Sequence, residues 1–257
     1  MVPKVDAFRT GDVLSGRQAM PARSFLAQLP PGSWPLLVGK WGADSRIHER
    51  DEELPIGPAD EHVHIVLGGC VRQDRHPLGT AEGSPKITRF RGAGQLLGEA
   101  KLIEPSAAVR TTCLTTTWVM ACPVPAMNLL LRRRPHIQLA LLRSLEDRNR
   151  TDELIYGTMT RPPLERVCAL LVHLAEVAGT TGADGTDDPG HLTILGPSQK
   201  DMAEALLLGV STVENTLRLL RTPAAQGGLF PDGVLRSGYR RFVVTDLPSL
   251  RAVAKLP

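Results

Sequence analysis

Four polar residues between Ser211 and Arg218 have the types and the spacing that reading a DNA duplex requires. Thr212, Asn215 and Arg218 recur at intervals of three, and Ser211 lies beside them. At this spacing they share one face of a helix. Hydroxyl, amide and guanidinium groups on such a face can hydrogen-bond base edges in a major groove. The alternative interpretation is an ordinary helical hairpin whose polar face is solvated.

Two short helices around a tight turn would position this face. Ser198 and Asp201 form a capping pattern at the start of the first helix. Gly209 marks the turn, because glycine tolerates the backbone angles that a turn needs. Ser211 and Glu214 repeat the capping pattern at the start of the second helix. That helix carries an apolar stripe that we expect to be buried: Val213, Leu217 and Leu220.

A basic β-hairpin is predicted to follow the second helix. Residues 234–245 have the pattern of two strands with a glycine at the tip, and Arg236, Arg240 and Arg241 gather on them. A helix-turn-helix followed by a basic hairpin is a winged helix, in which the hairpin holds phosphates while the helix reads sequence. Residues 247–254 are predicted to form the last helix.

A second set of residues could hold a phosphorylated sugar. Gly98 lets the backbone approach an anion, and a short helix after it would offer free N–H groups. Arg110 supplies a guanidinium that matches a phosphate, Thr111 supplies a hydroxyl, and Glu99 is an acceptor suited to a sugar hydroxyl. The alternative is a turn in which Glu99 and Arg110 only pair with each other.

The preceding elements alternate between short strands and a long helix. Residues 1–24 are expected to be a loose arm, followed by a short helix from Ser24. Short runs with the residue types of β-strands, at residues 63–71, 86–90 and 111–120, predict a sandwich or barrel, with a hairpin loop at residues 76–85. Residues 135–159 predict the longest helix. Seven residues of this helix are spaced by four or three positions, which is the pattern of a coiled-coil seam: Ile137, Leu141, Leu145, Arg148, Asp152, Ile155 and Met159.

The composition sets limits on these interpretations. The 257 residues allow two domains, and the net charge of +3 is mild, so DNA affinity must depend on local placement of cations. No apolar run approaches the roughly 20 residues that span a bilayer, and no signal sequence is evident, which favours a cytoplasmic protein. The four cysteines are far apart and are expected to be buried free thiols: Cys70, Cys113, Cys122 and Cys168.

The order of these motifs resembles the superfamily of the cyclic-AMP receptor protein and the fumarate–nitrate regulator (CRP/FNR). The resemblance covers roughly residues 46–253 and includes the glycine corner at residues 68–71, the Gly98-Glu99 pair and the Arg110-Thr111 pair. It implies an α+β fold with a cyclic-nucleotide-binding-like β-roll of the jelly-roll type at residues 25–134, after the arm at residues 1–24. A dimerisation helix at residues 135–160 and a winged helix-turn-helix domain at residues 161–257 would follow.

The resemblance also implies a function and partners. It implies a homodimeric transcription regulator, not an enzyme, that binds double-stranded DNA and works with RNA polymerase. Cyclic AMP or another cyclic nucleotide is implied as an effector, with Thr151 on the long helix near the base. The chain departs from the family pattern at Lys101, where a small residue is usual. The recognition helix also lacks the usual arginine and glutamate, so a different target sequence is expected.

Two other functions remain open from the sequence. His62 and His64 have a spacing found in metal-binding barrels, but no glutamate follows shortly after, and both histidines are expected to face solvent. A metal-dependent enzyme is therefore a weak alternative. The second alternative is an effector-binding or interaction protein that has lost specific DNA binding. This alternative stays open because the C-terminal region has no excess of positive charge.

Overall fold

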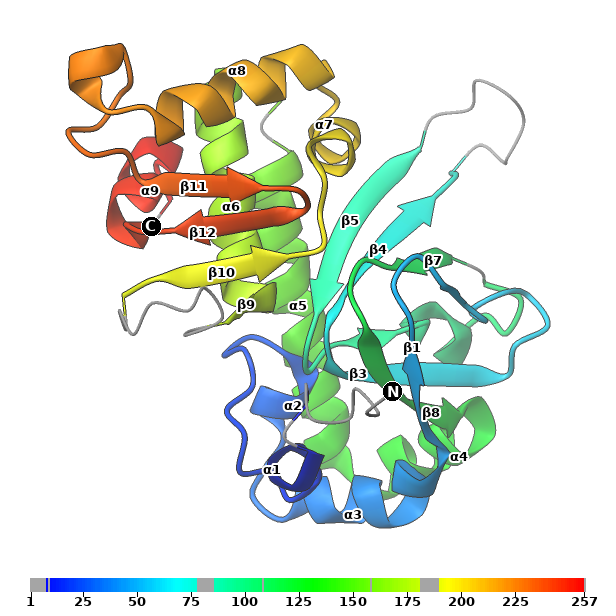
Figure 1. The fold of residues 1–257 in the computed structure, drawn as a ribbon. Coiled ribbons are helices and arrows are strands. Elements are labelled where there is room, and N and C mark those ends of the chain that lie inside the picture. Colours follow the sequence, from blue (N-terminus) through cyan, green and yellow to red (C-terminus); the bar gives the residue numbers. More distant parts are fainter. Residues whose placement is uncertain are drawn as a thin grey trace. The chain divides into compact units, whose positions relative to one another are not determined.

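A computed structural model of the chain describes residues 8, 10–77, 86–107, 109–157, 159–180 and 190–256 (Figure 1). The chain divides into two compact units. The first comprises residues 1–75 and 91–148, and the second comprises residues 76–90 and 149–257. Most of the hairpin loop predicted at residues 76–85 lies outside the described residues, as does most of the loop predicted at residues 179–190.

Two four-stranded sheets have the strand orders β1-β8-β3-β6 and β2-β7-β4-β5, and their strands belong to the first unit except that residues 87–90 of β5 are assigned to the second. Strands β1 and β3 pair antiparallel with β8, and β2 and β4 pair antiparallel with β7. The run at residues 111–120, which the sequence suggested as one strand, is two strands in different sheets, because residues 114–116 turn the chain. The strands are β1 (Ser45–His48), β2 (Glu53–Leu54), β3 (His62–Gly68), β4 (Cys70–Arg75), β5 (Ile87–Gly92), β6 (Leu96–Leu97), β7 (Arg110–Cys113) and β8 (Thr117–Pro123).

Gly69 makes the corner between β3 and β4. Its φ of 95° lies in the left-handed region, and a Cβ there would lie 2.7 Å from the Thr116 carbonyl oxygen. Any other residue would therefore meet both backbone strain and a steric clash. This confirms the glycine corner that the sequence predicted.

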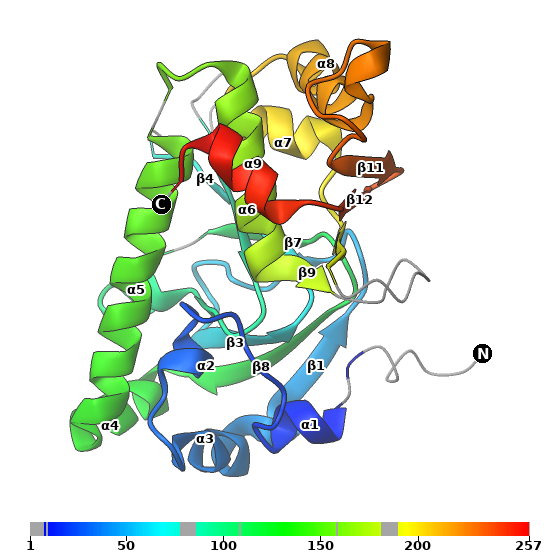
Figure 2. The same ribbon diagram turned by 90° about the vertical axis from the view of Figure 1, so that its left-hand side faces the viewer.

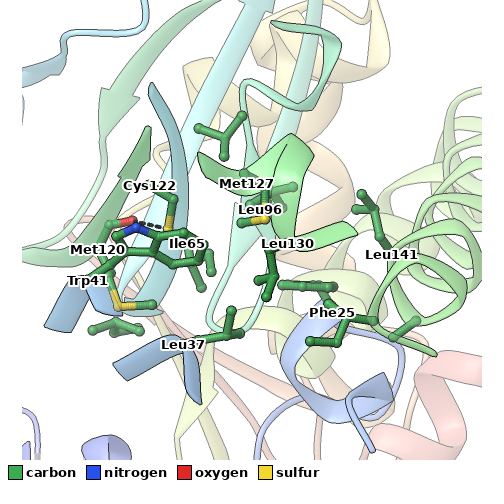
Figure 3. Packing of buried hydrophobic residues seen from close by; sticks show 14 of the residues in the cluster. Phe25, Leu37, Trp41, Ile65, Leu96, Met120, Cys122, Met127, Leu130 and Leu141 are labelled. Atoms are coloured by element: carbon green, nitrogen blue, oxygen red, sulfur yellow. Dashed lines mark hydrogen bonds between the residues drawn. The ribbon is translucent and has the colours of Figure 1, made fainter. Parts of the chain in front are cut away.

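Helices cover the first sheet and complete a hydrophobic core (Figure 3). Phe25, Leu37, Ile65, Met120 and Met127 are fully buried or nearly so. The predicted loose arm is wrong for residues 10–24, because Val13 is fully buried in this core. The helices of this unit are α1 (Thr10–Leu14), α2 (Phe25–Gln28), α3 (Ser33–Trp41), η2 (Gly42–Asp44), η3 (Glu99–Leu102) and α4 (Val124–Arg133).

The long helix α5 (Pro135–Tyr156) follows α4 and confirms the helix predicted from Pro135 (Figure 2). The predicted seam is not its free face. Ile137 and Leu141 belong to the hydrophobic core of the first unit, and Ile155 is also buried. Periodicity identifies the apolar face of a helix but not what covers that face, and here the chain's own core covers it. The exposed apolar side chains of α5 are Leu139, Leu142 and Leu154.

The second unit combines packed helices with a small sheet (Figure 1). Helix α6 packs against α7, α8 and α9, and the sheet has the strand order β11-β12-β10-β9. Cys168, Leu171 and Leu174 of α6 are fully buried. The elements are α6 (Pro163–Ala178), β9 (Gly179–Thr180), β10 (Leu192–Leu195), α7 (Gln199–Leu206), α8 (Val210–Arg221), η4 (Ala224–Gln226), β11 (Leu235–Gly238), β12 (Arg241–Val244) and α9 (Leu247–Ala254).

Candidate nucleic-acid interface and ligand cassette

Helix α7 begins with the capping arrangement that the sequence predicted. The Ser198 hydroxyl accepts a hydrogen bond from the Asp201 backbone N–H at 3.1 Å, and the Asp201 carboxylate accepts one from the Ser198 backbone N–H at 2.8 Å. Two donors of the first turn that have no partner within the helix are thereby satisfied. Met202 and Leu206 are buried on the inner face. The cap fixes where α7 starts, and the turn that follows then positions α8.

The turn between α7 and α8 differs from the prediction. Leu207, not Gly209, has the left-handed conformation, with φ at 53°, while Gly209 has φ at −68° and is the N-cap of α8. The Leu207 N–H bonds back to the carbonyls of Ala203 and Glu204, which ends α7. Ser211 is therefore inside α8 rather than its cap, and no side chain caps this helix.

Helix α8 has one buried face and one exposed face. Val213, Leu217 and Leu220 are fully buried, as predicted. Ser211, Asn215 and Arg218 are exposed, together with Glu214. Thr212 is half-buried, and its carbonyl accepts a hydrogen bond from the buried Thr216 hydroxyl at 2.8 Å. The buried stripe thus holds the helix on its unit while the polar residues face outward.

A hairpin of β11 and β12 lies next to α8. Gly238 pairs with Arg241, so Tyr239 and Arg240 make the two-residue loop. The left-handed residue is Arg240, with φ at 49°, rather than the glycine that the sequence suggested for the tip. Arg236 is exposed, and Arg240 and Arg241 are half-buried.

The hairpin is joined directly to α8. The Arg221 guanidinium donates to the Ser237 hydroxyl at 2.8 Å, and the Val234 N–H donates to the Leu220 carbonyl at 2.8 Å. Tyr239, which the sequence reasoning did not single out, is 88% exposed at the tip. The hairpin therefore presents cations and an aromatic ring at a fixed position relative to the end of α8.

The cassette begins as the sequence suggested. Gly98 has φ at 73° and precedes the short helix η3. The Glu99 carboxylate forms an ion pair with Arg148 of α5, which also donates to the Leu96 carbonyl at 3.4 Å. The sequence placed Arg148 in the predicted coiled-coil seam, and no local signal indicated a partner 49 residues away. Glu99 is therefore engaged by a cation from the same chain.

The other cassette residues point in different directions. Arg110 is largely exposed and pairs with Glu53 at 3.2 Å, so the alternative of a Glu99–Arg110 pair is wrong. Thr111, the next residue of β7, is fully buried, and its hydroxyl donates to the Val109 carbonyl at 3.2 Å. In a strand, successive side chains alternate between faces, which separates these two. Thr151 lies half-buried on α5, in the second unit.

Lys101 turns into the protein instead of facing solvent. Its side chain is buried, and its ammonium donates to the carbonyl oxygens of Gly57 at 2.7 Å and Pro105 at 3.4 Å. A buried ammonium requires such acceptors, because desolvation without them is costly. Lys101 thereby ties η3 to the loop before β3, so the departure from the family pattern has a structural role.

Of the two histidines expected to face solvent, His64 is buried, whereas the His62 side chain is 42% exposed. Asp60 holds both rings, with distances of 3.0 Å to His62 Nδ1 and 3.1 Å to His64 Nε2. His64 is buried because β3 is covered on both faces, so alternation along the strand does not apply. Burial lowers the pKa of His64, against the opposing effect of Asp60. Among the described residues, no group of three potential ligands could hold a metal ion.

The four cysteines are buried free thiols, as predicted. Burial raises the pKa of Cys113 to about 11 and that of Cys168 to about 12, and it raises the pKa of Cys122 further. Such thiols are protonated at neutral pH and react poorly. Within the ranges that the structure describes, no helix is long and apolar enough to cross a membrane.

Comparisons with known proteins identify the fold. No protein-family model matches the chain, and no curated protein matches it significantly. A solved structure from Ruegeria pomeroyi, provisionally described as a cyclic nucleotide binding protein, is 19% identical with a TM-score of 0.62, covering 96% of this chain and 99% of that one. A CRP/FNR-family transcriptional regulator from Thermus thermophilus is 20% identical with a TM-score of 0.57, covering 82% and 98%.

FixK2 from Bradyrhizobium japonicum is also similar, at 20% identity and a TM-score of 0.55, covering 81% of this chain and 96% of FixK2. At these identities the likeness concerns the fold. The chain has an α+β architecture with several antiparallel sheets, and this architecture is the fold of the CRP/FNR transcriptional regulators.

Proposed function

We propose that this protein is a dimeric, sequence-specific transcription regulator of the CRP/FNR type. In this proposal residues 161–257 are a winged helix-turn-helix domain, and the sheets of the first unit form a β-roll of the cyclic-nucleotide-binding kind. α8 is the recognition helix, and the hairpin of β11 and β12 is the wing. The likeness to solved regulators of this fold supports the proposal.

The exposed face of α8 carries the argument. Ser211, Asn215 and Arg218 point outward from a helix whose opposite side is fully buried. A recognition helix needs this division, since it must be held rigidly while its polar groups enter the major groove. The wing cations Arg236, Arg240 and Arg241 would hold phosphates beside it. These arginines are gathered on α8 and the wing, which is what DNA binding requires of a chain whose net charge is only +3.

Dimerisation would place two such helices on one duplex. The free apolar face of α5 supports a second copy as its partner: Leu139 is 46% exposed and Leu142 is 55% exposed. Their spacing of three fits a helix–helix seam. The proposed dimer face is therefore not the seam that helical periodicity suggested, because the seam residues Ile137 and Leu141 are buried in the core of the first unit. A two-fold pair would read two half-sites, about 34 Å apart.

Cyclic AMP or another cyclic nucleotide is the proposed effector, by analogy with structures described as cyclic-nucleotide-binding. Arg110 is the residue available to a cyclic phosphate, because it is exposed and its partner Glu53 is also exposed. A screened surface pair of this kind is weak and can be exchanged for a phosphate. Regulation would then pass to RNA polymerase through the DNA-bound dimer.

Binding of genomic fragments in a gel-shift assay with a salt titration tests the proposed function. Specific complexes should survive an excess of competitor duplex, and their affinity should fall steeply as salt increases. A protein whose complexes vanish with competitor at every salt concentration would be an effector-binding or interaction protein instead. Calorimetry with cyclic AMP and cyclic GMP, comparing the wild type with Arg110→Ala, tests the effector separately.

A further inference from the structure

The first turn of α8 presents an apolar side chain to solvent. Val210 is the first residue of the helix and is 47% exposed, next to the exposed Ser211. The N-terminal residues of a recognition helix are the ones that reach base edges. A half-exposed valine there adds little to folding, and it has the shape and polarity to pack on a methyl group.

The preceding backbone leaves room for a close approach. Gly209, the N-cap, has no side chain, and a Cβ built there would meet nothing nearer than the Thr212 hydroxyl at 3.5 Å. Gly209 itself therefore adds no side chain beside Val210, while Leu207, earlier in the same turn, is 63% exposed. Val210 and Ser211 are the side chains that this end of α8 offers to a base pair.

The exposed positions of α8 that follow Ser211 favour adenine over guanine as a second base contact. Residues 210–217 contain no lysine or arginine, so the first two turns have no cation to bind the acceptor pair of guanine. The exposed Asn215 carries an amide, which pairs with adenine through two hydrogen bonds. Arg218 follows Val210 by eight residues, about 12 Å along the helix axis, so a base that Arg218 contacts is a different one from the base beside Val210.

We propose that α8 reads A·T base pairs, with Val210 packed on the 5-methyl group of a thymine and Asn215 hydrogen-bonded to an adenine. This inference rests on the proposed function and specifies the DNA that the same helix selects. The thymine methyl is the one apolar group that base pairs present in the major groove. Exposed Glu214 on the same side disfavours a close phosphate, which keeps this turn directed at bases.

The experiment selects a binding duplex from a random library and then replaces single thymines with deoxyuracil, which lacks only the 5-methyl group. At one position in each half-site, we expect the replacement to weaken wild-type binding about four-fold per half-site, the effect of about one buried methyl. Val210→Ala should bind the thymine and uracil duplexes equally. Leu219→Ala is the matched control on the same helix, and it should keep the uracil penalty.

Asn215→Ala separates the two contacts. It should keep the uracil penalty and lose roughly 5- to 150-fold of the preference for adenine at a different base pair, the range of one bidentate contact. Selected half-sites without A·T pairs, or a uracil penalty that persists in Val210→Ala, would overturn this inference while leaving the proposed function intact. Failure of the wild type to select any duplex would overturn both.

Discussion

Placing a charge on the free face of α5 should separate the two subunits. Leu142 is 55% exposed in the single chain, so a partner helix would bury about half of its side chain. Complete burial of a leucine is worth about 1.5–3 kcal/mol, so this residue contributes about 1 kcal/mol per subunit. A two-fold interface contains it twice. Leu142→Glu should therefore cost the dimer about 2 kcal/mol before charge repulsion is considered.

That cost corresponds to a rise of about 30-fold in the dimer dissociation constant, since about 1.4 kcal/mol is a factor of ten. Two carboxylates facing each other across the two-fold axis would raise the constant further. Sedimentation equilibrium at several protein concentrations measures this constant directly. Because Leu142 is more than half exposed, the variant should fold, and its thermal unfolding monitors this.

Ile103→Glu is the matched control, because Ile103 is 92% exposed and lies outside α5. It introduces the same charge into the same unit without touching the proposed interface. An unchanged dissociation constant for Leu142→Glu, or an equal rise for the control, would refute the assignment of this face. A wild type that stays monomeric at all accessible concentrations would refute dimerisation itself.

Three further predictions concern the cap, the wing and the buried histidine. Ser198→Ala should lower the free energy of unfolding by about 1 kcal/mol in a denaturant titration, since one capping bond is lost, whereas a change below the error of the titration would contradict the capping role. Arg236→Ala should weaken binding to all duplexes alike and reduce the salt slope by about one, and a change in sequence preference instead would argue against a phosphate contact. The pKa of His64 is lowered by burial, so the folded state binds fewer protons than the unfolded state below pH 6.5; stability should fall as the pH decreases from 6.5 toward the folded pKa, and His64→Gln should flatten this part of the profile.

The elements that depend on local chemistry could be predicted from the sequence. The capping pair of Ser198 and Asp201 starts α7, and Leu247 and Ala254 bound the last helix as expected. Caps and apolar stripes act within a few residues, so the order of the amino acids contains them. The buried stripe of α8 followed from the same rule, and so did the outward direction of Asn215.

Contacts between distant parts of the chain could not be predicted in this way. Glu99 pairs with Arg148, and Lys86 pairs with Glu204, which lies 118 residues further along the chain. No periodicity encodes such partners, because they depend on how whole elements pack. The left-handed backbone of Leu207 could not be predicted either. A leucine side chain does not favour this conformation, which the end of α7 imposes.

Hydroxyl-radical footprinting of the protein on a selected duplex tests the central claim most directly. If the exposed face of α8 reads DNA in a dimer, two protected regions should lie on one face of the duplex, with centres about 10 base pairs apart. Loss of both regions together in Arg218→Ala would support the role of this face. Protection without this spacing, or no protection at protein concentrations that saturate the shift, would contradict it.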